Sequence, residues 1–138
     1  MDTKFSVALH ILIYISETDK VVSSELLAQS VNTNSSHIRK IIALLKKGGL
    51  IESQQGKTGI KLAKEPKDIT LSEIYKSIYP DKYLVNIHEG ANKECPVGLN
   101  IENLLQPVFN EAQEAFYKKL ESKTLEKLIK ELYIIGEK

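Results

Sequence analysis

The stretch from Ser23 to Ala63 constrains this chain more than any other part of its sequence. It contains two short amphipathic segments joined by a tight polar turn, and then two brief apolar runs on either side of a glycine-containing loop. This order is typical of a helix-turn-helix followed by a β-hairpin wing. The pattern predicts a mainly α-helical fold with a small β-wing, and it points to duplex DNA as the partner.

The first amphipathic segment opens on Ser23, whose hydroxyl suits a helix N-cap. Glu25 follows in the first turn, where the helix dipole favours a negative charge. The turn is expected at residues 32–34, Asn-Thr-Asn, because Asn tolerates the left-handed conformation better than most other residues.

The second segment, about residues 35–47, is the most informative element of the sequence. Its apolar residues fall at i, i+3, i+4 and i+7, which predicts one buried helix face: Ile38, Ile41, Ile42 and Leu45. The opposite stripe is small or basic and is flanked by two more cations: Ser36, Lys40, Ala43 and Lys47, with Arg39 and Lys46. A solvated surface helix usually mixes both charge signs, whereas this one has no acidic residue. A merely basic solvated face is the alternative interpretation.

A helix of this kind can enter a major groove. Ser35, Ser36 and His37 would then approach base edges or phosphates, while Arg39 and Lys40 reach guanine or the DNA backbone.

Gly48-Gly49 is expected to end this helix, and residues 50–51 and 60–62 have strand character. The loop between them carries Lys57 at its tip, which suits a wing that lies on phosphates or enters a minor groove; a plain hairpin is the alternative. The full set of predicted DNA-binding residues is Ser23, Asn34, Ser35, Ser36, His37, Arg39, Lys40, Lys47, Gln55, Lys57 and Thr58.

Charge is divided unevenly along the chain. The formal net charge is +1, but residues 1–64 hold nine Lys or Arg against five Asp or Glu, a net of +4. Residues 65–138 hold ten against thirteen, a net of −3, so the positive field lies on the half with the helix-turn-helix pattern. No nucleophile–base pair, acidic dyad or metal-ligand spacing is visible, which argues against an enzyme. The rival function is a winged helix used only for protein contacts.

An apolar run from Phe5 to Ile15 opens the chain. It is shorter than the roughly 20 residues that span a bilayer, and no cleavage site follows it, so we expect a buried helix that packs on the helix-turn-helix and on a second element. His10, its exception, is expected to be a core or interface histidine with a satisfied ring nitrogen. The single cysteine, Cys95, fits a reducing cytoplasm.

The C-terminal half is expected to be helical. Thr70–Glu73 forms a capping-box motif that opens a helix to about Tyr79, and residues 80–98 are polar and irregular. A long helix-compatible stripe then runs to about Ser122, where Pro107 either kinks the helix or marks its true start. A short last helix follows. We therefore expect a winged helix-turn-helix domain at 1–64, a connecting helix and sensor loop at 65–98, and dimerisation helices at 99–138.

Residues 26–51, with their closing Leu-Lys-Lys-Gly-Gly-Leu-Ile, resemble the winged-helix regulators of the IscR, CymR and NsrR type. The similarity continues through the wing, the helix at 70–78 and the long C-terminal helix. The resemblance implies a homodimer, paired through the long helix and the first helix, that binds palindromic operator DNA and usually represses transcription.

Two departures from that family are visible. The family's wing usually has an Arg-Gly pair, whereas this chain has Gln55-Gly56, so Lys57 is left as a phosphate contact. In the recognition helix of the iron–sulfur-cluster regulator, acidic and amide residues stand at the positions of Arg39 and Lys40. The operator of this chain should therefore differ in sequence from that regulator's operator.

Cluster-binding members carry three cysteines after the fourth helix, and this chain has only Cys95, so we predict no iron–sulfur cluster and no other cofactor. Cys95 is either a redox switch or an inert residue before Pro96, because Glu94 would raise its pKa and Lys93 would lower it. The alternative signal, given equal weight, is a small-molecule effector that binds between the wing domain and the long helix.

Overall fold

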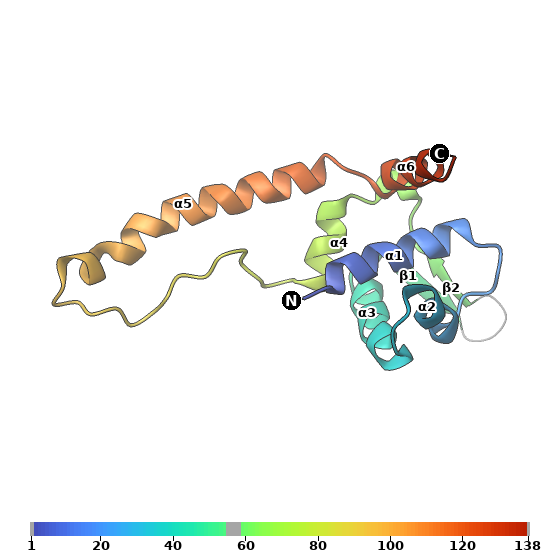
Figure 1. Cartoon of the computed structure of the whole chain (residues 1–138), viewed down its shortest axis with the longest axis horizontal. Coiled ribbons are helices and arrows are strands. Elements are labelled where there is room, and N and C mark those ends of the chain that lie inside the picture. Colours follow the sequence, from blue (N-terminus) through green and yellow to red (C-terminus); the bar gives the residue numbers. More distant parts are fainter. Residues whose placement is uncertain (1, 55–58, 138) are drawn as a thin grey trace.

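The computed structural model describes residues 2–54 and 59–137, and Figure 1 shows the arrangement of their helices and strands. The elements, in chain order, are α1 (Lys4–Glu17), α2 (Ser24–Val31), α3 (Ser35–Lys47), β1 (Ile51–Gln54), β2 (Gly59–Leu62), the 3-10 helix η1 (Pro66–Asp68), α4 (Leu71–Ile78), α5 (Pro96–Glu121) and α6 (Leu125–Gly136). This confirms the predicted fold class, mainly helical with a small β-wing.

Helix α1 lies at the centre of the hydrophobic core. Ala8, Ile11 and Leu12 are completely buried, and α1 contacts α2 and α3 of the helix-turn-helix as well as α4, α6 and β2. The prediction of a buried first helix with two packing partners is therefore confirmed. His10 has the satisfied ring nitrogen that we expected, because its Nε2 lies 2.9 Å from the Ser30 hydroxyl of α2, but it is exposed and not part of the core.

The wing is a two-stranded antiparallel sheet in which Ile51 pairs with Leu62 and Glu52 with Lys61. Its inner edge is tied to the segment before α2, because the Ile60 N–H donates to the Val22 carbonyl at 3.1 Å. One such bond does not make a strand, so residues 21–22 do not add a third strand to the sheet.

Thr70 caps α4 by accepting from the Glu73 N–H at 3.1 Å. The predicted capping box is only half formed, because the Glu73 carboxylate instead accepts from Lys64 Nζ at 2.7 Å. Just before α4, the chain also pairs with the start of α6: the Leu125 N–H donates to the Ile69 carbonyl at 2.9 Å. Leu125 is completely buried, so α6 packs on the N-terminal elements of its own chain.

Helix α5 projects from this body, and residues 80–95 run out beside it before the chain turns back (Figure 1). The helix begins at Pro96, earlier than expected, since a proline is well tolerated in the first helical turn, where its missing N–H would have no partner. It continues through Pro107, so that residue does not mark its start. No residue of α5 is buried. None of the described helices is long and apolar enough to cross a membrane.

Candidate nucleic-acid interface

The turn between α2 and α3 is fixed by two asparagines. Asn32 adopts the left-handed conformation, with φ of 63°, as the sequence predicted. Asn34 caps α3, because its side-chain oxygen accepts from the His37 N–H at 2.8 Å. Ser23 has the same role in α2, accepting from the Leu26 N–H at 3.1 Å. These caps set where both helices begin.

Helix α3 divides cleanly into an inner and an outer face. Three of the four residues predicted to face inward are completely buried and Ile42 is half-buried; the three are Ile38, Ile41 and Leu45. The exposed residues recur at helical spacing and contain no acid: Ser36, Arg39, Lys40, Ala43, Lys46 and Lys47. The outer face is therefore a single stripe of cations and small side chains about 13 residues long.

The remaining predicted contacts lie around this stripe. Ser35 and His37 are half-buried in the first turn of α3, and Ser23 and Asn34 are exposed at the helix starts, although the structure shows their oxygens engaged as caps. Gln55, Lys57 and Thr58 lie outside the described residues, so their contacts stay predictions. The structure brings the predicted α3 residues together on one surface beside the N-terminus of α2.

The end of α3 forms a two-glycine stop. The Gly49 N–H donates to the Lys46 carbonyl and the Leu50 N–H to the Leu45 carbonyl, both at 3.0 Å, with Gly49 at φ of +76°. Lys46 and Lys47 lie in the last turn, where positive charge interacts favourably with the helix dipole. The basic stripe therefore persists to the end of the helix.

One polar contact on this surface was missed by sequence reasoning. Glu25, in the first turn of α2, lies 3.8 Å from the Arg39 guanidinium of α3 (Oε1 to Nη1). The sequence assigned Glu25 only to the helix dipole. No local signal could have found the pair, because the two residues are brought together only when α2 packs on α3.

Cys95 directly precedes α5 and is exposed. The backbone N–H groups of Gly98 and Val97, which point out of the helix N-terminus, lower the pKa of the Cys95 thiol below its usual value. The sequence instead weighed the charges of Glu94 against Lys93. The N-terminus of α5 has the larger influence on the pKa of Cys95. The sequence analysis missed it because residues 96–98 were expected to be irregular and not the start of a helix.

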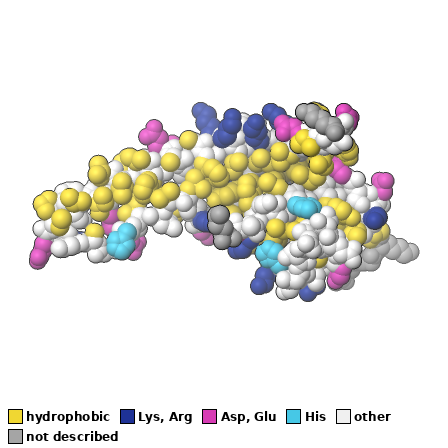
Figure 2. All heavy atoms as spheres, in the orientation of Figure 1, with side chains coloured by type: hydrophobic (Ala, Val, Ile, Leu, Met, Phe, Trp, Pro, Cys, Tyr) yellow, Lys and Arg dark blue, Asp and Glu magenta, His cyan; other side chains and the backbone are white. Residues whose placement is uncertain are grey.

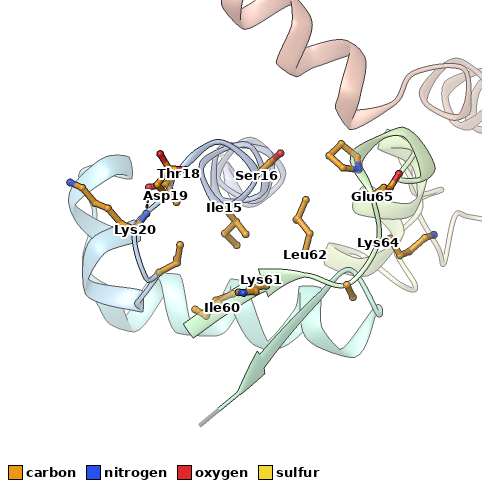
Figure 3. Close-up of a pocket in the computed structure, with 13 residues that line it drawn as sticks. Ile15, Ser16, Thr18, Asp19, Lys20, Ile60, Lys61, Leu62, Lys64 and Glu65 are labelled. Carbon is orange, nitrogen blue, oxygen red and sulfur yellow. Dashed lines mark hydrogen bonds between the residues drawn. The ribbon is translucent and has the colours of Figure 1, made fainter. Parts of the chain in front are cut away.

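A hollow of about 570 Å³ lies between the end of α1 and strand β2. In Figure 3, Ile15 from α1 and Leu62 from β2 both project into the space between the helix and the strand, while the charged ends of Lys20 and Lys64 point away. The hollow therefore has an apolar centre and a charged rim. It lies directly against β2, which is one of the two strands of the wing.

The site consists of two capped helices, an exposed basic stripe on the second helix, and a two-stranded antiparallel sheet that follows it in the chain. This combination defines the winged helix-turn-helix class of DNA-binding protein. Comparison with known proteins places the chain more closely. It belongs to the Rrf2 family, described as iron-dependent transcriptional regulators, whose model matches residues 1–131. The resemblance stated from the sequence is thus confirmed, and the chain is a DNA-binding transcriptional regulator and not an enzyme.

Three relatives illustrate the match. The chain is 40% identical to YwnA of Bacillus subtilis strain 168, named as an HTH-type transcriptional regulator, over 96% of this chain and 99% of that protein. It is 31% identical to the regulator NsrR of Halalkalibacterium halodurans, over 92% of this chain and 86% of NsrR. The structure of CymR, the global cysteine regulator of Bacillus subtilis, superposes with a TM-score of 0.65 over 94% of this chain and 95% of CymR; at 23% identity this shows a shared fold.

The family description names iron, and the residues of this chain do not fit a cysteine-bound cluster. The whole sequence contains one cysteine. Across residues 2–54 and 59–137, no three His, Cys, Asp or Glu side chains lie close enough together to hold a metal ion. Since iron–sulfur clusters are held by several thiolates, one chain lacks the ligands for such a site.

Proposed function

We propose that the protein is a cytoplasmic homodimeric repressor that binds a palindromic operator through α3 and the wing, and that its signal is a redox or small-molecule change sensed without an iron–sulfur cluster. The observation that carries this proposal is the outer stripe of α3. Its cations are exposed, its first turn offers hydroxyls, and no acidic residue interrupts it. Such a surface suits a major groove, where phosphate contacts give affinity and Arg or Lys contacts to guanine give specificity.

Arg39→Ala combined with Lys40→Ala tests the role of this stripe. Each side chain that contacts a guanine edge is worth about 1–3 kcal/mol of discrimination, so we expect specific binding to fall by roughly 30-fold or more. If both contact phosphates instead, the slope of log affinity against log salt should fall by about 1.8. The measurement is a gel shift on a duplex that the wild type has selected from a random pool.

Lys118→Ala combined with Lys119→Ala is the matched control, because it removes the same charge from an exposed part of α5. The control should bind the selected duplex nearly as the wild type does. If the Arg39 and Lys40 variant retained wild-type affinity, or if the control lost as much, the assignment of α3 as the recognition helix would be wrong.

The homodimer is supported by an uncovered apolar stripe on α5. The helix has 26 residues, which corresponds to a length of about 39 Å. Val97, Leu104 and Val108 share one face and are 57–67% exposed. On the visible face in Figure 2, hydrophobic side chains form a band along α5 that continues towards the body. A second copy of the stripe would bury this surface and bring two recognition helices to a spacing near one DNA turn, about 34 Å.

A second apolar surface supports involvement of the first helix. A groove of about 770 Å³ separates α1 from α6, and Leu9, Ile13, Leu128 and Leu132 line it. In a two-fold dimer, the apolar stripe on the partner's α5 could pack into this groove.

Leu104→Glu with Val108→Glu tests the dimer. Charges on the stripe should convert the protein to a monomer in sedimentation velocity and weaken operator binding, since both half-sites must be held together. Asn103→Glu adds a charge to the same helix away from the stripe and should stay dimeric. A dimeric stripe variant, or a monomeric wild type, would contradict the proposal.

Two features support a signal. The pKa of Cys95 is lowered and the thiol is exposed, which favours oxidation. Peroxide should change the operator affinity of the wild type and leave Cys95→Ser unaffected; equal responses would exclude the thiol.

The hollow beside β2 supports a small-molecule signal, because a ligand there would contact a strand of the wing. This is not the place expected from the sequence, since no residue of the long helix α5 lines the hollow. Ala63→Phe should fill it. A metabolite that raises the melting temperature of the wild type and not of this variant would identify an effector of that site, and one that acts on both would place the effector elsewhere.

A further inference from the structure

Glu25 is the only acidic residue between Lys20 and Ile51, the stretch that contains the whole helix-turn-helix. A carboxylate on a surface that approaches phosphates is repelled by them and weakens binding. The helix dipole favours an acid in the first turn of α2, and the structure points to a second role, because Glu25 lies near Arg39 on the outer stripe.

The carboxylate has a polar neighbour on each side. Its Oε1 lies 3.8 Å from Arg39 Nη1, and its Oε2 accepts from the Ser24 hydroxyl at 3.4 Å. Ser24 and Glu25 belong to the first turn of α2, whereas Arg39 belongs to α3. The contact thus joins the N-terminus of one helix to the outer stripe of the other.

Stability does not account for this pair. The Arg39 and Glu25 side chains are 57% and 69% exposed, and ion pairs of that kind contribute little to folding because water screens them. A guanidinium, in contrast, is a planar fork of donors whose orientation decides which base edge it can bind in two places at once. A free Arg39 would have to lose its rotamer freedom when it binds, and that loss lowers the gain from each correct contact.

We infer that Glu25 is a positioning residue that sets operator specificity: its charge draws the Arg39 guanidinium towards the α2 side of the outer stripe, so that Arg39 binds a guanine edge at one position of each half-site. The inference rests on the proposed operator binding. It predicts that Glu25 reduces general affinity for DNA and increases discrimination between sequences.

Glu25→Gln tests the inference, since it keeps the size of the side chain and removes the charge. The probes are the duplex that the wild type selects from a random pool and a shuffled duplex of the same composition. The variant should bind the shuffled duplex more tightly, and the ratio of selected to shuffled affinity should fall roughly threefold to tenfold. In a fresh selection, base preference should weaken at the same position at which Arg39→Ala loses it.

Two further variants make the result specific. Glu52→Gln removes the same charge from an exposed site on β1 and should tighten binding to both duplexes equally. In the Arg39→Ala background, Glu25→Gln should not reduce the ratio further. Thermal melts of each variant show whether any change instead reflects loss of folding.

An unchanged ratio in Glu25→Gln, or an equal fall in the ratio when Arg39 is already absent, would overturn the inference while leaving operator binding intact. If the wild type enriches no sequence from the pool, operator binding itself fails and the inference falls with it. These two failures are therefore distinguished by the wild-type selection alone.

Discussion

Replacing Gly48 with alanine tests how the end of the recognition helix is seated on α4. A Cβ atom at Gly48 would overlap the Ser77 Oγ and would lie 2.7 Å from the Ser77 Cβ. The Ser77 hydroxyl is itself engaged, donating to the Glu73 carbonyl at 2.9 Å. Rotation of that hydroxyl would relieve the first clash but not the second, because the Ser77 Cβ moves only with its backbone.

The size of the effect follows from the second clash. Carbon atoms in contact lie about 3.5–4.0 Å apart, so α3 and α4 must separate by roughly 1 Å. Overpacking of this kind costs about 1–3 kcal/mol, and we expect the upper half of that range because no side-chain rotation avoids it. For a chain of this length the loss corresponds to a fall in melting temperature of roughly 8–12 °C. Backbone strain adds nothing, since Gly48 has an ordinary helical φ of −77°.

The neighbouring glycine is a matched control, because a side chain there would meet backbone strain and no steric clash. Gly49 has φ of +76° and nothing within 4 Å of the position its Cβ would occupy, so Gly49→Ala should cost only the left-handed conformation, about 1–2 kcal/mol. Ser77→Gly should recover part of the stability of Gly48→Ala and none of Gly49→Ala. Thermal melts followed by far-UV circular dichroism, at one protomer concentration, measure all of these.

Two results would contradict this prediction: a melting temperature for Gly48→Ala that is no lower than that of Gly49→Ala, or a Ser77→Gly change that has the same effect in Gly48→Ala as in the wild type. In both cases the close approach of α3 to α4 would not limit what residue 48 can be.

Three other perturbations follow from the structure. Leu125→Ala should lower the free energy of unfolding by about 2–5 kcal/mol in urea titrations, because the side chain is completely buried; a loss below 1 kcal/mol would mean that α6 is not packed as described. Asn34→Ala should cost about 1 kcal/mol by removing the α3 cap, whereas Asn34→Asp should keep the stability and weaken DNA binding. Burial, with the nearby Asp2 carboxylate, raises the pKa of Tyr79 to about 12, so the neutral phenol stabilises the fold below pH 10 and that contribution is lost between pH 10 and 12. Tyr79→Phe should therefore lose stability less steeply than the wild type over that range, and identical pH profiles would contradict this.

The parts of the fold that the sequence predicts well are those set by local rules. The inner face of α3 follows from spacing alone, and the caps at Ser23 and Thr70 follow from side chains that bond to amides three residues ahead. Asn34 caps α3 by the same rule, although the sequence was used to assign it only to the turn and to DNA binding. The left-handed Asn32 and the two-glycine stop are equally local. In each case the residues that decide the conformation lie within one helical turn of one another.

What the sequence could not predict depends on contacts between distant segments. The capping box at Glu73 is incomplete because Lys64, in the loop after β2, pairs with the carboxylate. The pairing of Ile69 with Leu125 and of Glu25 with Arg39 joins residues that only the folded chain brings together. The early start of α5 was missed for a different reason: Pro96 and Gly98 usually signal a loop, and here the proline occupies the first helical position.

Helix α4 connects the recognition helix to the long helix, since it contacts both α3 and α5. Ser77 faces Gly48 at the end of α3, while the Tyr75 ring packs against Phe116 and Tyr117 of α5, with centroids 5.1 and 5.7 Å apart. Residues two apart lie on nearly opposite faces of a helix, so one eight-residue helix is clamped between the two. In a dimer joined through α5, the separation of the two recognition helices therefore depends on the seating of α4. The displacement of roughly 1 Å at residue 48 should then change the position of both recognition helices, one in each half-site. Gly48→Ala should therefore weaken operator binding even at temperatures where the variant is fully folded and dimeric.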